Sequence, residues 1–595
     1  MFTFFFQPKS VFLKSLTFFF LFYIKFPIFF ISSFLKKKDV RAVDANFEKH
    51  NFPYDVIWLD IEHTNGKRYF TWDSNLFPNS IKMINDIASK GRKVVTIVDP
   101  HLKRDGSYNV HTEAQAAGVY VQNKDGGEFD GWCWPGSSSY VDFTNPKARS
   151  WWADRFSLEN YKGSTMDLFT WNDMNEPSVF NGPEVTMQKD TKSIDGQESR
   201  EWHNLYGFYM QMATNEGQIR RQEDRSERPF LLSRSFFAGS QRYGAIWTGD
   251  NAGKWDHLEI AGPMLLSFNV AGLPFIGSDT GGFFGNPNEE LMTRWFQVSA
   301  YHPFFRAHAH HDAKRREPYV FGEPHTSRLR QAVVTRYQHL PLWYTLFRHA
   351  HIDGMPVMRA LWMEFPTDES IFDVDDAFMV GNSLLVKPIV TPGTTSTSVY
   401  FPYTEGTEGS GKGIERWFDT RNRQEYKGGS TETIQAPIDE IPVFQRGGTI
   451  VPKQMRVRRS SQLMVNDPYT LMIALDHNMN AKGDLYVDDF HTFHYETKKA
   501  YSHRLFEMTT HPTEGSLLSS TDYSKGESNQ NVFKPTNTIE RIVIVGLTSG
   551  TPNVVTVTTK SGERNIEFAY DTVTSTLTLR KPDMLVTEDW RITFK

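Results

Sequence analysis

Two aspartates, each closely following a tryptophan at the end of an apolar run, are the residues of this sequence best suited to chemistry. Asp173 stands in DLFTWNDMNEP (167–177) and Asp250 in AIWTGDN (245–251). Each run has the length of a buried strand, so both carboxylates could meet at one edge of a sheet. An ionised carboxylate and a protonated one, so placed, can cleave a glycosidic bond. For either aspartate, a helix N-cap or turn role is the alternative.

Three nearby groups have competing interpretations. Asp99, in VVTIVD, could line the same site or simply end a strand before Pro100. Glu176 is interpreted as a structural partner that orients its loop. HAHHD (308–312) has the spacing of metal ligands, but further ligands would have to converge on it, and Arg234 is a poor neighbour for a cation. We therefore predict no metal and no other cofactor, and loss of activity with EDTA would reverse that prediction.

The elements that would position these residues are six short apolar runs, each ending in a polar residue. Segments with the apolar spacing of helices, such as SIKMINDIASKG and HLEIAGPMLLSFNV, separate them. This alternation predicts an α/β fold, a (β/α)8 TIM-type barrel whose site lies at the carboxyl ends of the strands. No GxGxxG follows the first run, which argues against a dinucleotide-binding fold. The terminal residues of the six runs are Asp60, Asp99, Asp173, Arg234, Asp250 and Asp279.

Near Met355 the sequence pattern changes to short segments in which apolar and polar residues alternate, separated by Gly, Pro, Asp and Thr. Such segments are typical of β-sandwiches. We predict a catalytic barrel over 39–354, a proximal β-sandwich domain over 355–453 and a distal β-sandwich domain over 454–595.

Composition narrows the possible classes of protein. The 595 residues carry a net charge of −5, without long blocks of one sign, which disfavours nucleic acid as a partner. Cys133 is the only cysteine, so no intrachain disulfide can form. Residues 1–38 are rich in phenylalanine and have three interpretations: a signal anchor, a cleaved signal peptide, or an artefact of the gene model. A membrane association is expected only if this segment is genuine.

Longer motifs resemble those of glycoside hydrolase family 31. WNDMNEPSVFNGPEVTM (171–187) is similar to the nucleophile motif of that family, and IWTGDN (246–251) is similar to its acid/base motif. The resemblance implies that Asp173 is the nucleophile and Asp250 the general acid/base of a retaining mechanism, with carboxyl groups about 5 to 5.5 Å apart. It also implies substrate-binding residues: Asp60, Arg234, Asp279 and His308 for the hydroxyls of a glucose unit, and Trp134 and Trp247 as aromatic walls.

The resemblance extends from Val40 to Lys595 and carries a more specific expectation. It implies an exo-acting α-glucosidase of the endoplasmic reticulum lumen that trims α-1,3-linked glucose from N-linked glycans, in a heterodimer with a regulatory β subunit. Another α-glucosidase or an α-xylosidase of the same family is the alternative, as is a truncated, non-catalytic carbohydrate-binding form. The sequence departs from the family where the first barrel strand and a β-rich region before it are expected.

Overall fold

The computed structural model describes residues 36–404, 415–511, 515–524, 526–529 and 531–595. Most of the Phe-rich segment predicted for residues 1–38 lies outside the described residues. The first helix, α1 (Lys37–Lys49), begins at the end of that segment. In the part of the chain that the structure describes, no helix is both long enough and apolar enough to cross a membrane.

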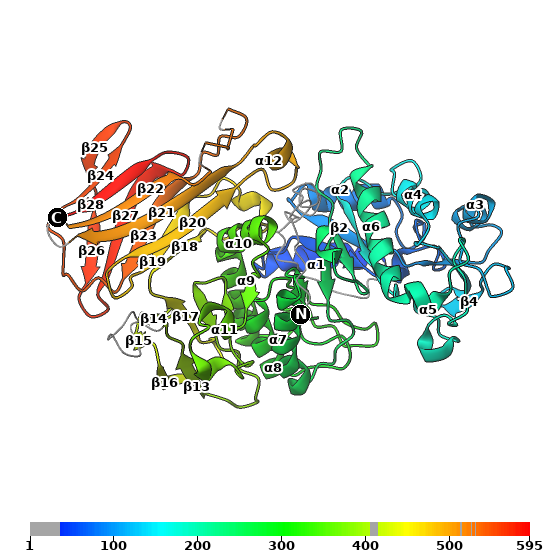
Figure 1. Cartoon of the computed structure of the whole chain (residues 1–595), viewed down its shortest axis with the longest axis horizontal. Coiled ribbons are helices and arrows are strands. Elements are labelled where there is room, and N and C mark those ends of the chain that lie inside the picture. The colour runs from blue at the N-terminus through cyan, green and yellow to red at the C-terminus, as the bar shows by residue number, and fades with distance from the viewer. Residues whose placement is uncertain (1–35, 405–414, 512–514, 525, 530) are drawn as a thin grey trace, which may run out of the picture.

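Six parallel strands form the first sheet, in the part of the chain coloured blue to green in Figure 1, and they are the six apolar runs of the sequence. Their spatial order equals their order in the chain, as in a singly wound barrel; a doubly wound sheet would reverse direction at a switch point. The predicted parallel sheet is therefore confirmed. The strands are β1 (Val56–Leu59), β2 (Lys93–Ile97), β6 (Leu168–Asn172), β7 (Leu231–Ser233), β8 (Ala245–Trp247) and β9 (Ile276–Gly277).

A seventh position in this series follows β9. The backbone N–H of Thr280 donates to the carbonyl of Arg306 at 2.8 Å, and Asp279 and Arg306 form a parallel bridge. Among the described residues, β1 and this segment are the two ends of the series. Helix α9 (His325–Gln338) contacts both ends: Tyr337 donates a hydrogen bond of 2.7 Å to Asp55, which directly precedes β1, and Arg336 donates one of 2.7 Å to the carbonyl of Pro303, three residues before Arg306.

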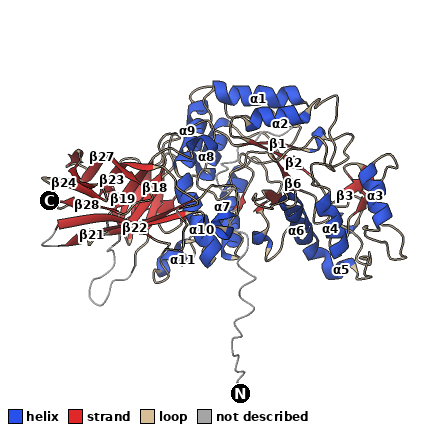
Figure 2. Cartoon of the chain, turned by 90° about the horizontal axis from the view of Figure 1, so that it is seen from above, coloured by secondary structure: helices blue, strands red, loops and turns tan. Residues whose placement is uncertain are grey.

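Helices cover the outside of this sheet (Figure 2). Both helical segments predicted from apolar spacing are confirmed, as α2 and α7. In α2 the buried residues Met83, Ile84 and Ile87 form one face, and Asn79 caps the helix by accepting from the N–H of Lys82. The longer helices of this part are α2 (Ser80–Ala88), α3 (Asn109–Ala117), α4 (Pro146–Asp154), α6 (Tyr206–Ile219), α7 (Trp255–Val270), α8 (Glu289–Ser299), α9 (His325–Gln338) and α10 (Leu340–Asp353).

The interior of the barrel contains a layer of large side chains. The guanidinium carbon of Arg306 lies 5.0 Å from the ring centres of Trp58 and Trp171 and 4.9 Å from that of Trp247. These four residues come from alternate positions of the strand series, as the layers of a (β/α)8 barrel do. The residues two positions after these four in the sequence are Asp60, Asp173, Gly249 and His308. The next layer toward the carboxyl ends of the strands is therefore polar.

The remainder of the described chain is rich in β-structure, as predicted. A six-stranded sheet follows the barrel, and a two-stranded ribbon packs against it around Phe401, Trp417 and Phe444. The sheet has the order β10 (Met358–Arg359), β11 (Phe378–Val380), β12 (Leu384–Val386), β17 (Val443–Arg446), β14 (Arg416–Asp419) and β15 (Glu425–Lys427); the ribbon is β13 (Ser396–Phe401) and β16 (Ser430–Gln435).

An eleven-stranded sheet forms the end of the molecule that holds the C-terminus (Figure 1). Its first strand begins at Thr449, ahead of the division predicted between residues 453 and 454, and the division itself stays a prediction. The strands are β18 (Thr449–Lys453), β19 (Tyr469–Ala474), β20 (Ala481–Val487), β21 (Ser502–His511), β22 (Gly515–Asp522), β23 (Thr538–Val545), β24 (Val555–Thr559), β25 (Gly562–Asn565), β26 (Phe568–Asp571), β27 (Thr576–Leu585) and β28 (Trp590–Phe594).

Candidate active site

Arg234, directly after β7, joins the acids that follow β6 and β8. Its Nη1 lies 2.8 Å from Asp173 Oδ1 and 3.6 Å from Asp250 Oδ2. Its other nitrogens form a two-pronged pair with Glu176, with Nε donating to Oε1 at 2.8 Å and Nη2 to Oε2 at 3.1 Å. This pairing fixes the plane of the guanidinium and agrees with the interpretation of Glu176 as an orienting residue.

The shared nitrogen limits the distance between the two aspartates. The gap between Asp173 Oδ1 and Asp250 Oδ2 cannot exceed the sum of their distances to Arg234 Nη1, 2.8 and 3.6 Å. This limit on one pair of oxygens admits the roughly 5 to 5.5 Å separation of a retaining pair, and that separation itself stays a prediction.

Burial dominates the ionisation of this pair. Burial raises the pKa of Asp173 to about 7; the charge of Arg234 opposes that change, and Asp250 adds to it. Burial likewise raises the pKa of Asp250, again against Arg234. Burial also raises the pKa of Glu176, but its bonds to Arg234 outweigh this and leave the pKa below its usual value. The charge of Arg234 therefore limits the increase in the pKa of Asp173 but does not cancel it.

The backbone at Asp173 is held in an uncommon conformation. The next residue, Met174, has a φ of 56°, in the left-handed region, and its sulfur lies 2.9 Å from Arg234 Nη2. Asn175 donates to the hydroxyl of Ser233, at the end of β7, at 2.9 Å. The β6 loop is thus anchored to the neighbouring strand on both sides of Arg234, which sets the direction of the Asp173 side chain.

Asp60 and His308 face each other beside this pair. His308 Nε2 lies 3.8 Å from Asp60 Oδ2, and the imidazole packs edge-on against Trp171 at 5.2 Å. Burial raises the pKa of Asp60 to about 8, and burial together with the charge of Arg306 lowers the pKa of His308 well below its usual value. The imidazole is therefore neutral, with one ring nitrogen able to donate and one able to accept.

Asp99 and Asp279 are both fully buried and each holds one oxygen without a hydrogen-bond partner in the described structure. Tyr69 donates to the other oxygen of Asp99, and Arg306 donates to Asp279 at 2.9 Å. Both ring nitrogens of His308 also lack a partner there. Buried polar atoms without partners are rare in proteins, and the hydroxyls of a bound sugar are groups that could satisfy them. This supports the interpretation of Asp99 as a lining residue.

The two predicted aromatic walls occupy different environments. Trp247 is buried and lies 5.8 Å from Trp171 in the layer beneath the acids. Trp134 is 41% exposed, in a rim formed by the three-stranded sheet β3 (His101–Lys103), β5 (Gly136–Tyr140) and β4 (Gly131–Cys133). Its ring meets that of Phe180 at 4.8 Å, which links this rim to the loop after Asp173.

Two residues of this site were missed in the sequence. Arg306 pairs with Asp279 and contacts the tryptophan layer, and Phe283 stacks on His308 at 5.3 Å. Arg306 ends the short stretch HPFFR, which pairs with its neighbour through a single bridge and was not counted as a strand. Phe283 follows a glycine pair in a loop, and no periodicity distinguishes it.

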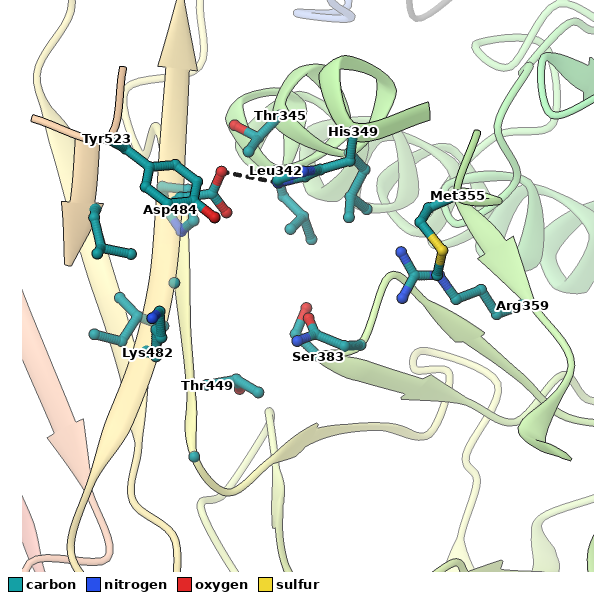
Figure 3. A pocket seen from close by; sticks show the side chains of 17 residues that line it. Leu342, Thr345, His349, Met355, Arg359, Ser383, Thr449, Lys482, Asp484 and Tyr523 are labelled. Carbon is teal, nitrogen blue, oxygen red and sulfur yellow. Dashed lines mark hydrogen bonds and ion pairs between the residues drawn. The ribbon is translucent and has the colours of Figure 1, made fainter. Parts of the chain in front are cut away.

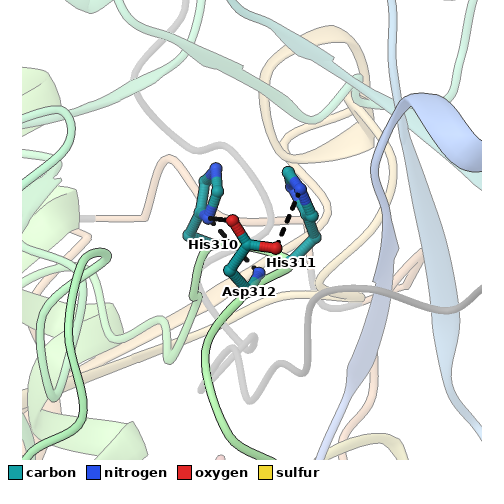
Figure 4. Close-up of side chains that lie close together, drawn as sticks. All are labelled: His310, His311 and Asp312. Carbon is teal, nitrogen blue, oxygen red and sulfur yellow. Dashed lines mark hydrogen bonds and ion pairs between the residues drawn. The ribbon is translucent and has the colours of Figure 1, made fainter.

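The histidines of HAHHD separate into two groups. His308 lies beside Asp60, whereas His310, His311 and Asp312 cluster together (Figure 4). His311 Nε2 lies 3.3 Å from Asp312 Oδ1, and the Asp312 side chain is 79% exposed. The metal interpretation of the full motif would need His308 in the same cluster, and its nearest acid is Asp60 instead.

Comparison with known proteins identifies the family of this chain. A family model described as "Glycosyl hydrolases family 31 TIM-barrel domain" matches residues 30–346, and one described as "Glycosyl hydrolase family 31 C-terminal domain" matches residues 354–451. The chain belongs to glycoside hydrolase family 31. This agrees with the resemblance found in the motifs at 171–187 and 246–251.

Curated relatives match most of this chain and are themselves longer than it. "Neutral alpha-glucosidase AB" of Dictyostelium discoideum is 52% identical over 94% of the chain and 57% of the relative. "Probable glucan 1,3-alpha-glucosidase" of Arabidopsis thaliana is 51% identical over 93% of the chain and 59% of the relative. The chain therefore spans rather more than half the length of these relatives.

Solved structures agree with the fold. A glucosidase II alpha subunit described as "alpha3-Glc2-bound" has a TM-score of 0.91 at 40% identity, covering 97% of this chain and 62% of that one. An "ER glucosidase II heterodimeric complex" of a catalytic subunit and the binding domain of a regulatory subunit matches with a TM-score of 0.91 at 41% identity, over 97% and 62%. A family 31 dextranase of Flavobacterium johnsoniae matches with a TM-score of 0.83 at 26% identity, over 96% and 71%.

Proposed function

We propose that the protein is a retaining exo-α-glucosidase in which Asp173 is the nucleophile and Asp250 the general acid/base. The single nitrogen of Arg234 that lies near both carboxylates carries this proposal, because it shows that the two acids form one pair, as the two-carboxylate mechanism requires. In the first step Asp173 attacks the anomeric carbon while Asp250 protonates the leaving oxygen. In the second step Asp250 takes a proton from a water molecule whose oxygen attacks the anomeric carbon and displaces Asp173, which releases glucose with its original anomeric configuration.

The remaining residues would hold the glucose unit in the barrel mouth. Asp60, Asp279 and His308 offer unpaired or weakly paired polar atoms to its hydroxyls. Trp247 lies beneath them, and Trp134 stands on the exposed rim, where a second sugar would leave the site. A site closed below by the tryptophan layer and open at the rim suits removal of one terminal sugar.

The proposed linkage is α-1,3, as trimmed from glucosylated N-linked glycans by glucosidase II. The name of the Arabidopsis relative and the α-1,3-diglucoside bound to the structural neighbour support it. We further propose a heterodimer with a regulatory β subunit in the endoplasmic reticulum lumen, supported by the heterodimeric complex among the neighbours. The dextranase neighbour makes a different α-glucoside linkage the alternative.

Product analysis tests the reaction. Proton NMR of an α-glucoside digest should show α-glucose first, with the β-anomer arising only by mutarotation. Appearance of β-glucose first would refute the retaining mechanism. Relative rates on α-1,3-, α-1,4- and α-1,6-linked diglucosides and on an α-xyloside then decide the linkage, and a preference for any but the first would overturn the glucosidase II assignment.

Azide distinguishes the roles of the two aspartates. Asp173→Ala should lose turnover and, with azide and an activated α-glucoside, form the β-glucosyl azide, because azide enters in place of the nucleophile. Asp250→Ala should form the α-glucosyl azide, since azide then attacks the covalent intermediate. An exchange of these products would reverse the roles. If the unaltered chain folds and binds α-glucosides without turnover, the non-catalytic alternative applies.

A further inference from the structure

A second cluster of titratable side chains lies where the barrel meets the eleven-stranded sheet. His349 on α10, Asp484 on β20 and His503 on β21 place their ligand atoms within 4.8 Å of one another. Both imidazoles approach the same oxygen: His349 Nε2 lies 2.8 Å and His503 Nε2 2.6 Å from Asp484 Oδ2.

The fold explains why these three meet. On the antiparallel pair β20 and β21, Tyr486 lies opposite His503. Asp484 stands two residues before Tyr486, so it shares that face of the sheet and is a diagonal neighbour of His503. The helix α10 packs on the same face, since the N–H of Tyr486 donates to the hydroxyl of Thr345 at 3.1 Å. One turn further along α10, His349 reaches Asp484.

The cluster borders a cavity of about 340 Å³ whose lining includes residues of α10, β10, β18, β20 and β21 (Figure 3). Asp484 and His349 line it, together with Ser383, Lys482 and Tyr523. The side chains of His349, Asp484 and His503 are 24%, 19% and 8% exposed. They are thus withdrawn from solvent yet reachable by a small ion that keeps a water molecule.

The chemistry of the three side chains matches one class of ligand. Two imidazole nitrogens and one carboxylate oxygen suit zinc and similar transition metals, whereas magnesium and calcium prefer oxygen alone.

We propose that His349, Asp484 and His503 bind a divalent transition-metal ion of the zinc type at this junction. Neighbouring ligand atoms around a tetrahedral zinc lie roughly 3.4 Å apart. Those of this cluster are 2.6 and 2.8 Å apart, so each ligand has to withdraw by less than about 1 Å. The cavity beside them holds the water that completes the shell.

The ion would join the last barrel helix to the distal sheet. Of the three ligands, His349 belongs to α10, and the other two belong to adjacent strands of that sheet. In the described structure none of them contacts Asp173, Asp250 or Arg234. The expected effect of zinc is therefore greater thermal stability, with the hydrolytic site unchanged.

The test measures metal binding by the full chain directly. After treatment with EDTA and desalting, addition of one equivalent of Zn²⁺ should raise Tm, and Co²⁺ substitution should give the visible bands of a low-coordinate site. X-ray absorption of the zinc-loaded protein should show imidazole scattering from two histidines. Absence of both a Tm increase and a Co²⁺ spectrum would overturn the proposal.

Variants locate the ion. His349→Ala and the more conservative His503→Gln should each weaken zinc binding at least about 10-fold, the smallest loss expected even for residues that only support a ligand. The matched control is His491→Ala, because His491 pairs with a single acid, Glu227, at 3.1 Å. Zinc binding that survives both ligand variants, or is lost instead in His311→Ala at the exposed cluster, would refute this location.

Discussion

Arg234→Gln is the substitution whose effect follows most directly from the site. The variant keeps a polar but shorter side chain and removes the only cation within 4 Å of Asp173 and Asp250 in the described structure. An adjacent cation lowers the pKa of an aspartate by about 1 to 3. Without it, the pKa of Asp173, now about 7, should rise to about 8 or above.

The loss of activity should depend on pH. A nucleophile must be ionised, and at pH 6 each unit of pKa increase reduces the ionised fraction about 10-fold. The pKa of Asp250 should rise as well, because Arg234 also opposes its protonation. Both limbs of the kcat/KM profile should then move to higher pH. At pH 6 we expect kcat/KM to fall at least about 10-fold, and the deficit should shrink toward pH 9.

The assay is hydrolysis of an aryl α-glucoside from pH 4 to 9. Arg234→Lys is the matched control: it keeps the charge but cannot pair with Glu176 through two nitrogens while also reaching Asp173. Its activity should fall with little movement of the acid limb. If Arg234→Gln lowers kcat/KM by the same factor at every pH, Arg234 acts only in binding, and the electrostatic reasoning is wrong.

Three other predictions concern stability and cofactor dependence. Burial raises the pKa of Asp55 to about 7, above its unfolded value, so the stability contributed by this carboxyl group is complete below about pH 4 and is lost as pH rises through 7. The unfolding free energy should therefore decrease between pH 4 and pH 8, and in Asp55→Asn this decrease should be smaller by on the order of 4 kcal/mol. Urea titrations that give the same decrease for both proteins would contradict this. Arg294, on α8, donates hydrogen bonds to four backbone carbonyls, those of Thr394, Ala436, Pro437 and Glu440. Arg294→Met leaves these carbonyls unpaired and should lower the unfolding free energy by at least about 3 kcal/mol. An unchanged Tm would show that water replaces the guanidinium. EDTA should leave initial rates of α-glucoside hydrolysis unchanged. An immediate loss of activity that Zn²⁺ restores would show instead that a metal ion acts in the active site.

The strands and the ends of the strands were predictable because their signal is local. A buried parallel strand needs a continuous apolar run, and the polar residue that follows it marks the strand end. The six runs ending at Asp60, Asp99, Asp173, Arg234, Asp250 and Asp279 therefore identified the sheet. The seventh segment, which brings Arg306 into the barrel, has too short a ladder to show such a run.

The sequence by itself determined which residues stand at the mouth of the barrel, since chain order equals strand order in a singly wound barrel. Only the tertiary structure decided how those residues act on one another. The pairing of Arg234 with Glu176, the raised pKa of Asp173 and the place of Arg306 among three tryptophans depend on distances between separate strands. Electrostatic energies change steeply with such distances and with burial, and neither is encoded in the spacing of residues along one chain.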